Sequence, residues 1–393
     1  MRTICFVATT PFVVNAFLLT HLKALADCYS VTLCVNCLLY PLSDRIDPRI
    51  RIVDVKIARE VSPFRDLRAF LFLVSLFRRE KFSAVHSITP KAGLLAMLAA
   101  RFAAIRFRHH TFTGQVWATR RGIVRHVLKT VDRLIVQLAS DVFTDSPSQC
   151  RFLEKERVVG PGGILVLGPG SISGVDVHRF RPDTESCHQV RAEFDVDEDR
   201  CIFLFVGRLT KDKGIHDLVQ AFAKVAVANP RVELWLVGPD EEGLMEQLGR
   251  RKPDDGGLVR WLGPTAQPER YMASADVLVL PSYREGFGSV IIEAAACAVP
   301  TIAYRIEGVI DAVVEDRTGV LVEVGDIEAL AAAMLDVSQD WDGRQRLGRE
   351  ARDRASKEFS SEIVTAEWVA LYKPLLNLAP PDDQLRGSVC PKS

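Results

Sequence analysis

Short apolar runs alternate with segments of helical spacing along most of the chain. Buried strands are predicted at twelve such runs, which are Thr3–Ala8, Ser30–Val35, Ile50–Val55, Ala84–Ser87, Arg106–Thr111, Val142–Asp145, Ile202–Val206, Val232–Val237, Val259–Leu262, Val277–Pro281, Thr301–Ala303 and Gly319–Val322. The intervening segments repeat apolar residues at helical intervals, as in Asp217–Asn229 and Ile327–Val337. Because strand–helix alternation favours parallel sheets with helices on both faces, we predict an α/β fold.

The pattern starts again near residue 201, after the polar segment Arg181–Arg200. A chain of 393 residues is also longer than the ~250–300 residues at which a single core stops growing. We therefore predict two doubly wound, Rossmann-like domains. Their bounds are 1–180 and 181–360, followed by a terminal helix over 361–378 and a mobile tail over 379–393.

The net charge of zero, from 50 basic and 50 acidic residues, hides a division between the two halves of the chain. Residues 1–182 hold 26 Lys and Arg against 13 Asp and Glu, whereas residues 183–393 hold 24 against 37. A basic half suits an anionic membrane or a phosphate-bearing partner. Nucleic acid is the weaker candidate, because the sequence contains no recognised nucleic-acid-binding module.

Cysteine use and hydropathy favour a reducing, cytoplasmic location. The nine cysteines are scattered, and the close pair Cys34 and Cys37 lacks a second pair or a histidine cluster at zinc spacing. Two buried residues near a strand end are therefore favoured over a redox or metal half-site. The apolar N-terminus has no convincing cleavage site and is interpreted as the first strand. The longest apolar run, Ala69–Phe77, is about half the ~18–20 residues of a membrane span.

The first motif with candidate chemistry is FVGRLTKDKGIHDLV, at residues 205–219. A predicted strand ends at Gly207, and Arg208 and Lys213 follow in a loop before a helix. Ligands bind at the carboxyl ends of parallel strands in such sheets. The planar fork of Arg208 and the point charge of Lys213 together suit a diphosphate, although a solvated basic loop would have the same composition.

The second motif is PSYREGFGSVIIEAAACAVP, at residues 281–300. Glu285 lies in a loop after a predicted strand, Gly286–Gly288 follow, and a helix begins near Ser289. Glycines at a helix start permit close approach of the main chain, and the free N–H groups there attract phosphate. Glu293 lies one turn inside this helix among apolar neighbours, which disfavours a surface salt bridge. Its carboxylate can accept hydrogen bonds from paired sugar hydroxyls.

Through these two motifs and their spacing, the sequence resembles the family 4 retaining glycosyltransferases, which have the two-domain GT-B fold. The run from Glu285 to Glu293, two acids eight positions apart, is the most specific feature. Supporting segments are GRLTKDKG at 207–214, LVGPDEEG at 236–243, RWLGPTAQPERYMASADVLVLPS at 260–282, VVEDRTGVLVEVGD at 313–326, DSPSQCRFL at 145–153 and GSISGVDVHRF at 170–180. The resemblance covers nearly the whole chain and implies a cleft between two domains, with the terminal helix crossing back onto the first domain.

The resemblance also assigns donor-site roles to residues of the second domain. It implies a UDP-linked sugar as the donor, and no bound metal or other cofactor. The matching residues are Arg208 and Lys213 for the diphosphate, Glu285 for the transferred sugar, Gly286, Phe287, Gly288 and Ser289 for the turn and helix start beneath the sugar and phosphate, Glu293 for the ribose, and Leu262 and Gly263 for the nucleobase. Asp195 and Asp197 have the spacing of a metal motif, but they lie in the acidic segment between the domains, where solvation is expected.

In the first domain, AVHSITPKAGLLAML (84–98) resembles the acceptor side of transferases that build bacterial surface polysaccharides and O-antigen. His86 and Lys91 are therefore candidates for acceptor contacts. The second histidine of the relatives is Ile88 here. The alternative for His86 is a strand-end histidine with a local partner.

The next loop, RHHTFTGQVWATRRG (108–122), contains Thr113 where many relatives have a histidine that contacts the donor sugar. Thr113 cannot act as a titrating base, but its hydroxyl can bond to a sugar hydroxyl. Retention in this family is ascribed to attack from the same face, in which the leaving phosphate takes the acceptor proton. A protein base is then not needed, and Glu285 and Thr113 are the predicted catalytic residues.

Two predicted helices of the first half are basic and amphipathic. Arg121, Arg125, Lys129 and Arg133 recur every four residues and predict one charged stripe, with the apolar residues of that helix facing elsewhere. The segment 64–81 likewise combines Leu, Phe and Val with five basic residues. Such helices can lie on anionic lipid, and the alternative is a solvated face over an ordinary core.

The sequence therefore predicts an enzyme, a metal-independent retaining glycosyltransferase of lipopolysaccharide or other polysaccharide synthesis. It would transfer a hexosyl or N-acetylhexosaminyl group from a UDP-sugar to a lipid-linked or membrane-borne saccharide, peripherally on the cytoplasmic face of the membrane. One alternative is a GT-B nucleotide-sugar epimerase, which product analysis without acceptor would reveal. Another is a non-catalytic, nucleotide-sugar-binding subunit of a polysaccharide complex, which turnover of labelled donor with a crude membrane acceptor would exclude.

Overall fold

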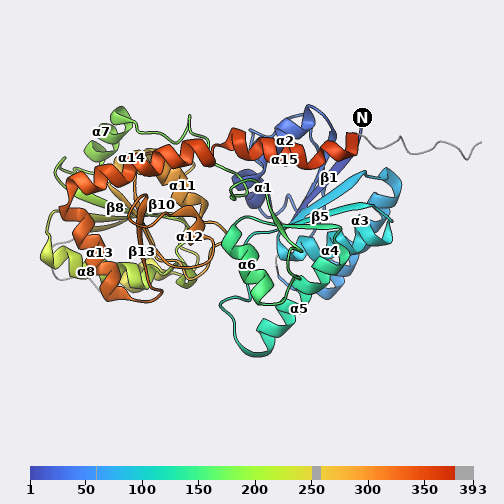
Figure 1. The fold of residues 1–393 in the computed structure, drawn as a ribbon, viewed down its shortest axis with the longest axis horizontal. Coiled ribbons are helices and arrows are strands. Elements are labelled where there is room, and N and C mark those ends of the chain that lie inside the picture. Colours follow the sequence, from blue (N-terminus) through green and yellow to red (C-terminus); the bar gives the residue numbers. More distant parts are fainter. Residues whose placement is uncertain (59, 250–257, 377–393) are drawn as a thin grey trace, which may run out of the picture.

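Two parallel sheets organise the computed structural model, which describes residues 1–58, 60–249 and 258–376 (Figure 1). The first sheet has seven strands in the order β3-β2-β1-β4-β5-β6-β7, and the second has six in the order β10-β9-β8-β11-β12-β13. The strands are β1 (Thr3–Ala8), β2 (Ser30–Val35), β3 (Arg51–Asp54), β4 (Ala84–Ile88), β5 (Phe107–Phe112), β6 (Asp141–Thr144), β7 (Leu165–Val166), β8 (Cys201–Val206), β9 (Val232–Val237), β10 (Leu258–Gly263), β11 (Val277–Leu280), β12 (Thr301–Tyr304) and β13 (Gly319–Val322). Both orders reverse direction at the first strand of the sheet, which confirms the two predicted doubly wound units.

Helices connect the strands and cover both sheets. Those of the first domain are α1 (Pro11–Phe17), α2 (Leu19–Ala26), α3 (Pro63–Glu80), α4 (Pro90–Phe102), α5 (Gly122–Leu138) and α6 (Pro147–Lys155). Those of the second are α7 (Thr184–Glu193), α8 (Ile215–Ala228), α9 (Leu244–Gly249), α10 (Pro268–Ser274), α11 (Ser289–Ala296), α12 (Val309–Ala312), α13 (Ile327–Gln339) and α14 (Trp341–Glu358), with a 3-10 turn at Lys211–Lys213. Proline begins α1, α3, α4, α6 and α10, where its missing N–H leaves no helical bond unmade. No helix within the described ranges is long and apolar enough to span a bilayer.

Alternate residues of β1 show how the first sheet builds a core on each face. Cys5 and Val7 belong to the core shared with α3 and α4, whereas Ile4 and Phe6 belong to a separate core shared with α1 and α2. All four side chains are buried. A strand covered on both faces appears in the sequence as a continuous apolar run, which is why the strands could be located.

The last helix, α15 (Ser361–Leu376), passes from the second domain to the first and lies beside α2 (Figure 1). Trp368 and Tyr372 are buried in the core on the α2 side of the first sheet. Two buried histidines of the first domain bond to this helix. His21 Nδ1 lies 2.8 Å from Thr365 Oγ1, and His86 Nδ1 lies 2.6 Å from Tyr372 Oη. The end of the chain therefore completes the core of the first domain, while residues 377–378 and the predicted tail 379–393 lie outside the described residues.

Two features of the fold differ from the sequence-based expectation. Strand β7 has only two residues, too few for a pattern to reveal it. The segment Arg181–Arg200 was expected to be a polar connection, but it forms α7, which packs on α10. Val190 is buried there, and Arg191 lies 2.8 Å from Asp276. This segment is a structural part of the second domain.

Four histidines of the first domain are buried without charge. Burial lowers the pKa of His21 and of His109 to about 4 and that of His110 to about 3, and it holds the pKa of His86 well below its usual value. Below about pH 6.5 the unfolded chain therefore takes up protons that the folded chain cannot, so stability falls as the pH decreases toward 4.

We expect the folded protein to lose stability between about pH 7 and pH 5, and we expect His109→Phe to reduce that loss. The ring of His109 stacks on Phe143 at 5.7 Å, and in the described structure its buried Nδ1 has no hydrogen-bond partner. Phenylalanine keeps the packing and removes the titration. The loss of unfolding free energy from pH 7 to pH 5 should therefore be roughly 1–2 kcal/mol smaller in His109→Phe than in the wild type. Urea unfolding at both pH values measures it, with the exposed His188→Phe as control. An unchanged pH dependence in His109→Phe would contradict the assignment.

Candidate active site

The two domains touch at the carboxyl ends of their sheets, and Gly286 lies at the point of contact. A Cβ atom added to Gly286 would lie 2.2 Å from Asp145 Oδ2 and 2.8 Å from the carbonyl carbon of Thr113. A Cβ atom added to Gly114 would lie 3.1 Å from Gly286 N. The absence of side chains at both glycines thus lets the two main chains meet. Thr113, a predicted site residue, lies directly beside the loop that carries Glu285.

Three glycines leave the edge of the second sheet without side chains. Gly207, Gly238 and Gly263 stand at the ends of β8, β9 and β10, and Gly238 N donates to Gly263 O at 2.9 Å. A Cβ atom at Gly238 would lie 1.8 Å from Gly207 O. Leu262 beside them packs against the core of the domain. Such an edge can receive a flat ligand close to the main chain.

The two predicted diphosphate residues are both paired with acids. Lys213 Nζ lies 2.5 Å from Glu285 Oε1, and Arg208 donates to Glu241 Oε2 at 2.8 Å. The side chains of Lys213 and Glu285 are largely buried, while those of Arg208 and Glu241 are about one-third exposed. The structure therefore brings Arg208, Lys213 and Glu285 to one edge. An incoming anion would there replace the carboxylates that now pair with the two cations.

Glu293 lies on α11, the helix that follows the Glu285 loop. Burial raises the pKa of Glu293 to about 7; nearby Arg179 acts to lower it and Glu269 to raise it further. Among the described residues its carboxylate has no hydrogen-bond partner. The helix begins at Ser289, after Gly288 in the left-handed conformation (φ 76°). The Phe287 side chain is buried against Phe359 (5.1 Å between ring centroids), so it is the main chain of this turn that remains for a ligand.

Asp145 is a further acid at the contact, and the sequence analysis gave it no role. It follows β6 and is buried, which raises its pKa to about 7, and the charges of Glu285 and Asp311 act in the same direction. Asp145 comes directly after a buried strand, so the rule that ligands bind at the carboxyl ends of parallel strands would have indicated it in the segment DSPSQ.

The structure does not place His86 at the cleft. Its Nδ1 bonds to Tyr372, its Nε2 lies 2.8 Å from Thr111 Oγ1, and its ring stacks on Phe6 and Trp368. A fully buried ring with both nitrogens engaged cannot contact an acceptor, so that prediction is wrong. The alternative of a strand-end histidine with a local partner is also not met, since His86 lies in the middle of β4 and Tyr372 is 286 positions away in the chain. Lys91, the other acceptor candidate of this segment, is 2.7 Å from Asp66 Oδ1, which ties α4 to α3.

Two residues of the basic stripe on α5 face the protein and not the solvent. Arg125 and Lys129 lie 2.8 and 2.7 Å from Glu156 Oε2, and both cations lie over the ring of Trp117. The predicted single charged stripe is therefore divided, because Glu156 and Trp117 cover Arg125 and Lys129. The exposed side chains of α5 include four apolar ones, Ile123, Val124, Val127 and Leu134, beside the polar His126, Thr130, Arg133 and Gln137.

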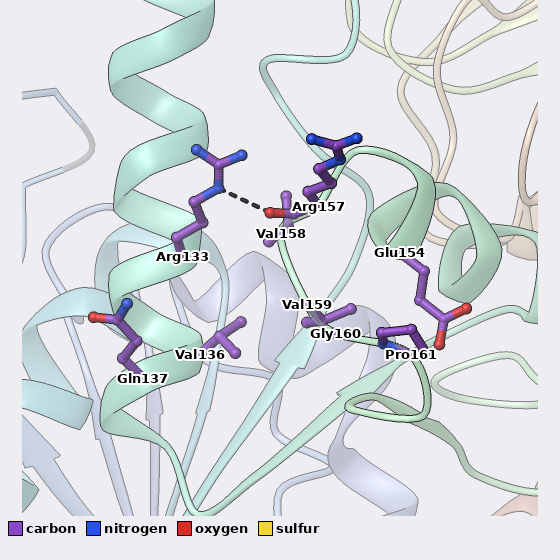
Figure 2. Close-up of a pocket in the computed structure, with 9 residues that line it drawn as sticks. All are labelled: Arg133, Val136, Gln137, Glu154, Arg157, Val158, Val159, Gly160 and Pro161. Atoms are coloured by element: carbon purple, nitrogen blue, oxygen red, sulfur yellow. Dashed lines mark hydrogen bonds between the residues drawn. The ribbon is translucent and has the colours of Figure 1, made fainter.

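The remaining residues of the stripe occupy two different positions. Arg121 is exposed at the residue before α5. Arg133 lines a groove of about 600 Å³ between α5 and residues 157–161, and its Nε donates to Arg157 O at 2.9 Å (Figure 2). No predicted donor residue lines this groove. The stripe is thus not a single surface.

Cys34 and Cys37 have the environments expected near a strand end. Cys34 is buried with its Sγ 3.5 Å from Cys5 Sγ, and Cys37 Sγ lies 3.8 Å from Val35 O. Every cysteine in the described ranges is a free thiol. In those same ranges, no group of three or more His, Cys, Asp or Glu side chains is arranged to hold a metal ion.

We expect Gly286→Ala to destabilise the contact between the domains. The new Cβ would overlap Asp145 and the main chain of Thr113, an overpacking that costs about 1–3 kcal/mol of unfolding free energy. Gly160→Ala is the matched control, since its Cβ would have no neighbour within 4 Å. Chemical unfolding measures both variants, and equal stability of the two would show that the contact is not close in solution.

Comparisons with known proteins agree with this geometry. Residues 14–170 match the family described as glycosyl transferase 4-like domain, and residues 188–354 match the glycosyl transferases group 1. The chain is 31% identical to the capsular polysaccharide biosynthesis glycosyltransferase CapM of Staphylococcus aureus over 82% of this chain and 84% of that protein. It is 28% identical to the UDP-Gal:alpha-D-GlcNAc-diphosphoundecaprenol alpha-1,3-galactosyltransferase of Escherichia coli, over 76% and 78% of the two chains.

The fold also matches solved structures. The structure of Anabaena HepE in complex with UDP and glucose superposes with a TM-score of 0.77 at 20% identity, over 96% of this chain and all of that chain. The likeness to the solved structures and the two parallel-sheet domains confirm the predicted GT-B fold. With the extended similarity to CapM, these observations identify the chain as a glycosyltransferase of family 4, among relatives that build bacterial surface polysaccharides.

Proposed function

We propose that this glycosyltransferase transfers a hexosyl or N-acetylhexosaminyl group from a UDP-sugar to a lipid-linked or membrane-borne saccharide, with retention at the anomeric carbon. The observation that carries the proposal is the set of side chains at the edge of the second sheet. Two cations, Arg208 and Lys213, lie there with the acid Glu285, and Glu293 offers a carboxylate that has no protein partner among the described residues.

The donor diphosphate would take the place of the acids that now pair with Arg208 and Lys213. An arginine fork and an ammonium group bind phosphate oxygens more strongly than neutral donors do. The start of α11 at Ser289 adds main-chain N–H groups. Leu262 and Gly263 would line the base and Glu293 would accept from the ribose hydroxyls. The complex of HepE with UDP and glucose supports a uridine nucleotide as the donor carrier.

Charge on the leaving group can be stabilised by these side chains. As the bond between the sugar and the β-phosphate breaks, negative charge develops on the diphosphate, and Arg208 and Lys213 would stabilise it without a bound metal or other cofactor. In same-face attack, the acceptor oxygen bonds to the anomeric carbon while its proton passes to a leaving phosphate oxygen. Glu285 and Thr113 would then hold the sugar hydroxyls, and neither has to act as a base.

The relatives and the charge of the first domain support a membrane-borne acceptor. The Escherichia coli relative acts, by its name, on a diphosphoundecaprenol-linked sugar. The excess of basic residues before residue 183 favours an anionic surface or a lipid diphosphate. The enzyme would therefore work peripherally on the cytoplasmic face of the membrane, in lipopolysaccharide, O-antigen or related polysaccharide synthesis.

The surface that we propose for the membrane is the rim formed by the first turns of α3 and α5. Helices that follow parallel strands begin at the carboxyl edge of the sheet, where the two domains meet. Phe64 is 89% exposed and Ile123 is 79% exposed. In the described structure, their exposed basic neighbours form no ion pair, and these are Arg65, Arg68, Arg120 and Arg121. Apolar side chains flanked by free cations suit an anionic bilayer.

Lys213→Ala and Glu293→Ala should each weaken UDP binding by at least about tenfold, because each removes a charged contact worth ~1.5–3 kcal/mol. Isothermal titration calorimetry with UDP measures the change, and Lys224→Ala, an exposed lysine of α8, is the control. Affinity like that of the wild type in both variants would refute the donor site. A mass-spectrometric screen of UDP-sugar hydrolysis and transfer, with a crude membrane acceptor, then tests the reaction.

Phe64→Asp combined with Ile123→Asp should abolish binding to vesicles of phosphatidylcholine and phosphatidylglycerol without changing UDP affinity. The control is Val227→Asp, which replaces a 65% exposed apolar residue of the second domain. Co-sedimentation measures the bound fraction, which should also fall as salt is raised. Equal binding to vesicles without phosphatidylglycerol would count against the proposed surface.

A further inference from the structure

The first turn of α6 reaches across the domain contact to the loop that carries Glu285. Ser146 Oγ donates to Gly286 O at 3.1 Å, and Gln149 Nε2 donates to Glu285 O at 2.8 Å. Ser146 is also the N-cap of α6, because its Oγ accepts from Gln149 N at 3.2 Å. One hydroxyl thus joins the cap of a helix in the first domain to a main-chain carbonyl in the second.

Ser148 holds the start of α12 against the same turn. Its Oγ accepts from Gly308 N at 2.6 Å, and its own N–H donates to Asp311 Oδ2 at 2.7 Å. A Cβ atom on Gly308 would lie 2.2 Å from Gly286 O, so α12 and the turn at Gly286 are in direct contact. The first turn of α6 therefore bonds to both segments on either side of this contact.

These hydrogen bonds are shielded from water. Ser146, Ser148 and Gln149 are 0, 3 and 4% exposed, respectively. A buried donor or acceptor that loses its partner costs about 1–3 kcal/mol, so the arrangement is strongly held once formed. Gln149 Oε1 is buried and has no partner in the described part of the chain, which leaves the amide held only through its nitrogen on Glu285 O.

The carboxylate of Glu285 has no comparable anchor of its own. Its side chain is paired with Lys213, the residue that we propose for the diphosphate. When the diphosphate of a donor pairs with Lys213 in place of Glu285, the position of Glu285 depends on its main chain. Gln149 holds that main chain from the first domain. In the part of the chain that the structure describes, Leu262, Gly263 and Glu293, which we propose for the nucleotide, make no hydrogen bond to α6.

We propose that Ser146, Ser148 and Gln149 are positioning residues, which place Glu285 on the donor sugar when the domains are together. The inference rests on the proposed function and deepens it, because residues of the first, acceptor-binding domain would then set the position of Glu285 on the donor sugar. A displacement of about 1 Å at a reacting centre can reduce the rate by about 10²-fold. Turnover should therefore depend on these residues, while nucleotide affinity should not.

The test compares Gln149→Glu and Ser148→Ala with the full-length wild type. Gln149→Glu is isosteric but replaces the donating nitrogen by an acceptor facing Glu285 O. We expect kcat for UDP-sugar hydrolysis to fall by at least about tenfold in both variants, with the Kd for UDP within about threefold of wild type. Ser148→Thr keeps the hydroxyl and should recover most of the rate. Gln189→Ala, on the exposed surface of α7, is the control.

The substrates for the assay are UDP-glucose, UDP-galactose and UDP-N-acetylglucosamine, and the one that wild type turns over fastest is used for all variants. A fall of UDP affinity in parallel with kcat, or an unchanged kcat in both variants, would overturn the positioning role. Wild type that neither binds UDP nor turns over any of the three sugars would instead reject the proposed function. Melting temperatures near that of wild type show that the variants are folded.

Discussion

Close main-chain contact at Gly286 is the constraint on which the arrangement of this enzyme depends. A Cβ atom added to Gly286 would overlap Asp145 and Thr113, and a Cβ atom added to Gly308 would overlap the carbonyl oxygen of Gly286. Protein interiors are packed too densely to absorb an added methyl group at such a point. The contact therefore fixes the distance between the carboxyl edges of the two sheets, and with it the place of Glu285 relative to the first domain.

Charge at the donor edge is balanced locally and not by the domain as a whole. The second half of the chain has more acids than bases, yet we propose that it binds a diphosphate. Arg208 and Lys213 are paired with Glu241 and Glu285, and in our proposal the diphosphate replaces those acids. Such an exchange would keep each cation paired, which would avoid the cost of an isolated buried cation at Lys213.

Helix α15 is a second connection between the two domains. It begins beside the second domain and ends in the core of the first, where Trp368 and Tyr372 pack against β1. The histidines that bond to it, His21 and His86, are neutral because burial disfavours their charged forms. The two domains are thus connected both at the contact around Gly286 and through this helix, which restrains how they can separate.

The sequence by itself determined the two doubly wound domains and every strand except β7, because buried parallel strands are continuous apolar runs. Periodicity could not orient α5, since the partners of Arg125 and Lys129 are Glu156 and Trp117, which come from other segments. It also could not show that His86 would be enclosed by α15, whose Tyr372 is 286 positions later in the chain. Which side of a helix is covered, and which polar groups face each other across two domains, depends on contacts distant in the chain, and only the tertiary structure decided them.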